Sequence, residues 1–173
     1  MTRVLAIVAI IVAARSARAD DGALGFRIAG GELPLADTRP TVVSIAVGTE
    51  QELAHGWRGF GEFEYMWFEK DKLTTGSGSR VQLGVRHVLA ERTIESTIRL
   101  YIDGELGGGM ALVSNTTVQA VPDGFAGLRL GYDIVEHADR SPSQKLQLEL
   151  SLRALYVPDG LGLMGGIGVW WGN

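Results

Sequence analysis

Cysteine is absent from this sequence of 173 residues, so neither disulfide bonds nor thiolate chemistry contribute to its fold or function. Long apolar runs are also scarce: Val4–Ala14 spans 11 residues and falls short of the roughly 20 that a membrane-spanning helix needs. Basic residues are outnumbered 16 to 20, which argues against nucleic acid as a partner because phosphate binding needs a basic surface. With three scattered histidines and no cysteine, we expect no metal site and no cofactor.

The N-terminus has the pattern of a secretory signal peptide. A short positive start precedes the apolar run, and Ala17-Arg18-Ala19 is a small-residue cleavage site, so we expect cleavage after Ala19 and export of the remaining chain. An exported domain without disulfides must be held together in another way. A closed, hydrogen-bonded barrel meets that need.

The sequence is rich in alternating apolar and polar residues. Across Gln144–Tyr156, QKLQLELSLRALY, every second residue is apolar, which is typical of a β-strand with two unlike faces. Glycine makes up 24 of 173 residues, about twice its usual share of roughly 7%, and this favours tight turns and close-packed backbone. Eight such segments are predicted as strands: Thr41–Thr49, Trp57–Phe68, Ser79–Leu89, Ser96–Leu106, Met110–Val121, Gly124–Val135, Gln144–Tyr156 and Leu161–Trp171.

Turn-forming residues separate these segments. Gly107-Gly108-Gly109, Pro122-Asp123-Gly124 and Pro158-Asp159-Gly160 are predicted as tight turns between antiparallel neighbours. Eight strands of about 10–13 residues in a meander can close on themselves. We therefore predict an all-β fold, an antiparallel up-and-down transmembrane β-barrel of about eight strands.

The predicted domain organisation is simple. Residues 1–19 are the signal peptide, residues 20–40 an N-terminal segment, and residues 41–173 the barrel domain. Within the N-terminal segment, Ala23–Ala29 also alternates. The sequence leaves open whether this piece is an additional strand or a tether.

The two faces of the predicted strands differ sharply in charge. The apolar face holds no Asp, Glu, Lys or Arg, whereas the polar face holds both signs in nearly equal numbers. Buried charges are tolerated only when they are paired, so near-balance is what an enclosed interior requires. The residues predicted to line the lumen as a charged network are Arg58, Glu62, Glu64, Arg80, Arg86, Arg99, Asp103, Glu105, Arg129, Asp133, Glu149 and Arg153.

Aromatic residues of the apolar face lie mostly near strand ends. Amphipathic rings at both ends of a lipid-facing strand suit the two membrane interfaces. The predicted interface aromatics are Trp57, Tyr65, Trp67, Tyr132, Tyr156 and Trp171. The alternative is a soluble periplasmic, lipocalin-like barrel, in which the same apolar rows point inwards and line a pocket for a hydrophobic ligand.

With its signal peptide, its eight amphipathic segments and its last strand Leu161–Trp171, the sequence resembles the small outer-membrane β-barrels of Gram-negative bacteria, the OmpA/OmpX-like family. The ending GGIGVWWGN is similar to the C-terminal assembly signal of that family. The resemblance implies a monomer of the cell envelope that contacts outer-membrane lipid and is inserted by the barrel-assembly machinery through its C-terminal strand. It implies a porin-like wall with a structural or narrow-channel role, because eight strands enclose a space that side chains fill.

The same resemblance predicts which connections face outwards. An N-terminus in the periplasm and a first strand at Thr41–Thr49 place Glu50–Gly56, Ala90–Glu95 and the two Pro-Asp-Gly turns on the outer side of the membrane.

Catalytic chemistry is sparse in this sequence. Glu62 and Glu64 are two residues apart, as an acid–base pair can be, but charges of both signs recur on every neighbouring strand, which favours an ion-pair network. His87 lies on the apolar face without the serine two residues later that lipase-like barrels pair with it. We therefore expect no enzymatic activity.

Overall fold

The structure, a computed structural model, describes residues 22–35, 38–71, 74–95, 97–114, 118–136 and 144–172. The predicted signal peptide lies outside the described residues. No helix in these ranges is long and apolar enough to cross a membrane. The strands are β1 Gly22–Glu32, β2 Thr41–Ala54, β3 Trp57–Asp71, β4 Thr74–Glu95, β5 Ile98–Ser114, β6 Val118–Glu136, β7 Gln144–Val157 and β8 Gly160–Gly172.

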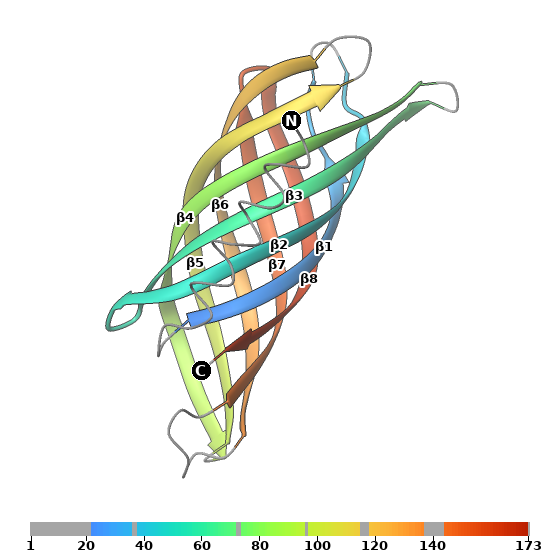
Figure 1. Cartoon of the computed structure of the whole chain (residues 1–173). Helices are drawn as coiled ribbons and strands as arrows, with labels where there is room; N and C mark the ends of the chain where they lie inside the picture. Colours follow the sequence, from blue (N-terminus) through green and yellow to red (C-terminus); the bar gives the residue numbers. More distant parts are fainter. Residues whose placement is uncertain are drawn as a thin grey trace.

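These strands form one closed barrel (Figure 1). Each strand pairs antiparallel with the next, and β1 pairs with β8, which confirms the predicted eight-stranded, all-β meander. Following the paired residues once around the wall from Gly22 returns to β1 at Glu32, ten residues further along. Such a stagger obliges the strands to tilt against the barrel axis.

Strand pairing defines the two ends of the barrel. Ala23 pairs with Gly172 where β1 begins and β8 ends, and we call this the terminal end. The β2–β3 turn at His55-Gly56 lies at the terminal end. The β1–β2 connection and the turn at Pro158-Asp159 lie at the opposite end.

The barrel begins at Gly22, earlier than the predicted start at Thr41. Ala23–Ala29 lies in β1, which settles the question that the sequence left open. Glycines at both ends of this strand interrupt its alternation of apolar and polar residues, so the sequence did not identify it clearly. An additional first strand moves the next connections to the other end, so the predicted sidedness of Glu50–Gly56 and Ala90–Glu95 was wrong: both lie toward the terminal end. The turn at Pro158-Asp159 keeps its predicted place away from the terminal end, because the single strand β5 replaces two predicted strands and restores the count.

Two of the predicted turns are strand interiors. Gly107-Gly108-Gly109 lies within β5 and Pro122-Asp123-Gly124 within β6, so Met110–Val121 is not a separate strand. Close packing explains the glycines, since a Cβ at Gly107 would lie 2.6 Å from the ring of Phe125. By contrast, Pro158-Asp159-Gly160 forms the predicted turn, with Gly160 at φ +137°.

Candidate functional site: the charged interior and the apolar outer face

Side chains of opposite character separate cleanly across the barrel wall. Along β7, Leu148 is 43% exposed and Leu150 is 56% exposed, whereas Glu149 between them is 4% exposed. The charged face therefore fills the interior and the apolar face points out. The lipocalin-like alternative was wrong, because it needs the apolar rows on the inside.

Glu62 on β3 is the centre of the interior network. Its carboxylate accepts hydrogen bonds from three guanidinium groups, those of Arg27 at 2.8 Å, Arg86 at 3.2 Å and Arg153 at 2.6 Å. Arg153 also donates to Glu105 at 3.0 Å. Because the three arginines belong to β1, β4 and β7, one carboxylate connects four strands across the lumen.

A second group of ion pairs lies nearer the terminal end. Glu50 on β2 accepts a hydrogen bond from Arg58 at 2.6 Å and from Arg129 at 3.3 Å. Arg129 also donates to Glu149 at 2.8 Å and to Asp103. Arg86 donates to Glu50 as well as to Glu62, so the two groups form one continuous network.

Toward the opposite end the network continues through Glu64 and Arg80. The Nε of Arg80 donates to Glu64 at 2.7 Å, and the hydroxyl of Ser44 donates to the same carboxylate. Arg80 also lies 3.6 Å from Asp123. Asp123 was assigned to a turn by its Pro-Asp-Gly context, yet it points inwards from β6.

At the terminal end the charges become partly accessible. Asp133 is buried and lies 2.6 Å from Arg99 and 2.9 Å from Lys145. Arg99 also lies 3.2 Å from Glu91, whose side chain is 54% exposed. These residues form the edge between the closed interior and solvent.

The structure places every predicted lumen residue on the inward face. All of them are buried except Arg58 and Arg99, which are partly exposed near the terminal end. Sequence reasoning missed Arg27 and Glu50. Arg27 lies in Ala23–Ala29, whose assignment as a strand the sequence left open. Its position between Phe26 and Ile28 nevertheless places it on the face opposite to theirs. Glu50 comes one residue after the predicted end of its strand. Asp123 and Lys145 also join the network.

Inward glycines make room for large rings in this narrow space. A Cβ at Gly131 would lie 1.9 Å from the ring of Tyr101, and one at Gly25 would lie 2.2 Å from the ring of Trp170. Arg86 lies over the Trp170 ring at 4.9 Å, a distance suited to cation–π attraction. The rings thereby cover the apolar faces of the guanidinium groups that they contact.

Toward the opposite end, the interior becomes apolar. The β1–β2 connection contributes Leu33, which is 2% exposed, and the ends of β2 and β7 contribute Val42 and Val157. This cluster fills the lumen beside the ion pairs, and we call it the apolar plug. Its buried members are Ala29, Leu33, Val42, Phe60, Met66, Phe68, Ala111, Phe125, Leu155, Val157 and Met164.

The outer face carries aromatic residues at two levels. Trp57, Tyr132 and Trp171 lie near the terminal ends of β3, β6 and β8, and Tyr65, Trp67 and Tyr156 lie near the opposite ends of β3 and β7. Trp57, Trp67 and Trp171 are 44%, 45% and 66% exposed. Between the two levels, the outward positions of the described strands carry no Asp, Glu, Lys or Arg.

His87 packs with the aromatic residues at the terminal end of the outer face. Its ring stacks on Trp57 with centroids 4.3 Å apart, and its Nδ1 lies 3.0 Å from the carbonyl oxygen of Gly56. Within the described residues, no group of three or more His, Asp or Glu side chains is arranged to hold a metal ion.

Solved structures share this architecture. Neisserial surface protein A, NspA, aligns over 86% of this chain and 95% of its own, with a TM-score of 0.59 and 12% identity. Ail of Yersinia pestis and the N-terminal β-barrel domain of Pseudomonas aeruginosa OprF cover 87% and 86% of this chain and 97% and 96% of theirs, at TM-scores of 0.43 and 0.42 and identities of 15% and 11%. No family model and no curated protein matches the sequence. At this identity, the likeness to NspA shows the fold: a small eight-stranded barrel, as the sequence pattern predicted.

Proposed function

We propose that this protein is an integral outer-membrane β-barrel with a structural role in the bacterial cell envelope. Its apolar outer face meets lipid, and its interior is closed to solutes by ion pairs and the apolar plug. The predicted N-terminal export signal and the fold shared with NspA support an envelope location.

The spacing of Trp57 and Trp67 carries this proposal. Both point outwards from β3, ten residues apart. At about 3.3 Å per residue and a strand tilt of about 40°, they are separated by roughly 25 Å along the barrel axis. The apolar band of outer-membrane barrels is about 25 Å tall and is bordered by aromatic residues. A soluble barrel has no reason to keep charges off its surface between two such levels.

The interior supports a structural role over a channel. Arginines and carboxylates fill the terminal half, and toward the opposite end buried apolar residues fill the lumen beside the Glu64–Arg80 ion pair. A solute would have to separate paired charges and then displace the plug, and uncompensated buried charges are costly. We therefore propose that the barrel does not conduct ions.

The same proposal covers how the barrel is inserted and how many copies it contains. We propose that β8 is read by the barrel-assembly machinery, since it alternates apolar residues outwards and carries Trp171 near its end. The closed sheet leaves no strand edge for a second copy, so the barrel acts as a monomer surrounded by lipid. We propose that the terminal end faces the periplasm, the side from which the chain inserts.

Two measurements test the proposal. The full-length protein is expressed in a Gram-negative host, and its membranes are fractionated, extracted with carbonate and analysed by gel mobility of unheated and boiled samples. We expect recovery in the outer membrane and a heat-dependent mobility shift. Recovery as soluble periplasmic protein would overturn the membrane assignment. Purified protein is then added to planar bilayers, where steady ion conductance would overturn the closed interior while leaving the location intact.

A further inference from the structure

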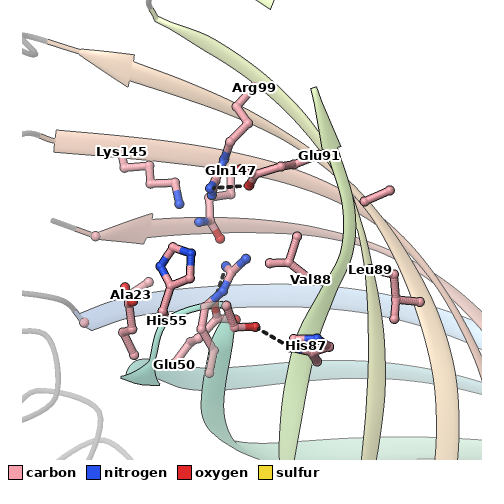
Figure 2. A pocket seen from close by; sticks show the side chains of 16 residues that line it. Ala23, Glu50, His55, His87, Val88, Leu89, Glu91, Arg99, Lys145 and Gln147 are labelled. Carbon is pink, nitrogen blue, oxygen red and sulfur yellow. Dashed lines mark hydrogen bonds and ion pairs between the residues drawn. The ribbon is translucent and has the colours of Figure 1, made fainter. Parts of the chain in front are cut away.

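A pocket of about 590 Å³ opens at the terminal end of the barrel (Figure 2). It is formed by the ends of β1, β2, β3, β4, β5, β7 and β8 together with the β2–β3 turn. Its volume lies within the range of small-molecule sites. The pocket faces the aqueous phase whatever surrounds the outer wall, so its chemistry is independent of the membrane assignment.

The charged side chains of this pocket balance one another. Three cations line it, Arg58, Arg99 and Lys145, and so do three carboxylates, Glu50, Glu52 and Glu91. A multivalent anion would meet the carboxylates, and a simple cation would meet the three bases. Arg58 pairs with Glu50 at 2.6 Å and Arg99 with Glu91 at 3.2 Å, which leaves Lys145 and Glu52. A ligand with one charge of each sign, held apart, fits these two residues.

Gln147 shows that the pocket has unused hydrogen-bonding capacity. It is 3% exposed and lines the pocket, yet its Oε1 is buried without a partner. Among the described residues its side-chain amide makes no hydrogen bond. The amide nitrogen, unlike Oε1, is not among the fully buried unpaired atoms, so it can be reached from the pocket and can donate hydrogen bonds there.

Lys145 and Glu52 supply the two charges that a ligand can use. Lys145 is two residues before Gln147 on β7, and its only ion-pair partner in the described ranges is Asp133 at 2.9 Å, so two of its three N–H groups remain available. Glu52 on β2 is exposed and has no ion pair in the described part of the chain. In Figure 2, Lys145 and Gln147 lie on one side of the pocket and His55 and Glu50 lie on the other.

We infer that this pocket binds a small zwitterion, an amino acid or a short peptide. The ligand carboxylate accepts hydrogen bonds from Lys145 and from the Gln147 amide nitrogen. Its ammonium group lies toward Glu52 and donates to it.

The test uses three related ligands and one site-specific signal. Full-length protein in detergent micelles, labelled with ¹⁵N, is titrated with alanylalanine, with its C-terminal amide and with its N-acetyl derivative, while the side-chain amide of Gln147 is followed by NMR. We expect a saturable shift with alanylalanine at a dissociation constant of about 1 mM or below. Loss of either charge is expected to weaken binding by about tenfold.

Variants assign each charge to its residue. Lys145→Gln is expected to weaken binding of alanylalanine but not of its C-terminal amide. Glu52→Gln is expected to weaken binding of alanylalanine but not of the N-acetyl derivative. Arg92→Gln, at an exposed position outside the pocket, is the matched control and leaves all affinities unchanged.

Several outcomes would overturn the inference. They are the absence of a saturable shift at Gln147, equal affinity for the three ligands, or variants that weaken all three ligands alike. The ligand series on the unmodified protein decides the matter if a variant fails to fold. Failure here leaves the membrane assignment untouched, because that assignment is tested by fractionation.

Discussion

Arg153 and Glu62 meet across the lumen of the barrel. The guanidinium group on β7 donates to the carboxylate on β3 at 2.6 and 3.1 Å, in the two-pronged geometry that makes such pairs strong. β3 and β7 are four strands apart in a ring of eight, so they stand on opposite walls. Both side chains are about 1% exposed. The pair therefore holds the two walls at a fixed separation.

Neutralising Glu62 is expected to destabilise the barrel severely. Glu62→Gln removes the charge that Arg27, Arg86 and Arg153 share, and breaking one side of a buried ion pair costs about 3–5 kcal/mol. The free energy of unfolding in urea, measured in lipid vesicles, checks this. Glu52→Gln, at an exposed position, is expected to stay within about 0.5 kcal/mol. Similar losses in both variants would contradict an ion-paired core.

Arginine on the outer face is expected to have an effect that depends on depth. Leu152 lies midway between the two aromatic levels on β7, and Leu146 lies directly opposite Trp171. Leu152→Arg is expected to lose about 2–4 kcal/mol in vesicles, and Leu146→Arg about 0–1 kcal/mol, because the cost of a charge falls toward the interface. Equal losses at the two positions would count against a bilayer around this face.

Inward and outward glycines are expected to respond differently to a methyl group. Gly131→Ala forces a Cβ onto the Tyr101 ring and is expected to lose about 1–3 kcal/mol. Gly124→Ala, where the nearest atom lies 3.8 Å away, is expected to be neutral or stabilising by about 0.4–1 kcal/mol. Urea unfolding measures both. Adding Tyr101→Leu to Gly131→Ala is expected to recover part of the loss, and no recovery would show that the clash lies elsewhere.

Trp171 and Trp57 lie at the same aromatic level but on different strands, β8 and β3. Comparing their variants therefore distinguishes a role of β8 in assembly from a role of the aromatic ring in anchoring. Trp171→Ala is expected to reduce the folded, heat-shiftable fraction in cells severalfold while leaving unassisted refolding into vesicles nearly unchanged. Trp57→Ala is expected to leave assembly in cells close to normal. Quantitative gels of outer membranes and refolding kinetics provide the two readouts. If both variants assemble alike in cells, β8 has no special part in insertion.

The sequence pattern predicted the fold class and the side of the wall on which each of the twelve predicted lumen residues lies. Alternation on β7 and β8 was enough, because one face of each strand is uniformly apolar and the other is not. Where glycine interrupts the pattern, prediction failed. Gly107 and Gly109 read as a turn, but they are small because neighbouring backbone and the Phe125 ring occupy the space of a side chain. Such a reason depends on tertiary contacts that no local pattern contains.

Which charged residues pair with one another inside the lumen could not be predicted from the sequence either. The charged residues were identifiable one strand at a time, but Glu62 meets Arg153 only because the stagger of the closed sheet brings β3 and β7 into register across the interior. Missing β1 removed Arg27 from the expected set. It also reversed the side assigned to Glu50–Gly56 and Ala90–Glu95, whereas the turn at Pro158-Asp159 kept its side because β5 replaces two predicted strands.

The seam between β1 and β8 has a kinetic consequence. Ala23 pairs with Gly172, so the bonds that seal the cylinder join residues nearly the whole chain apart. Contacts of such long range form late and slowly, because the entropy of closing the intervening loop must be lost first. Until β8 arrives, the seven earlier strands leave two unsatisfied edges, which are prone to aggregation. The barrel therefore stays open to aggregation until its last strand has paired with its first.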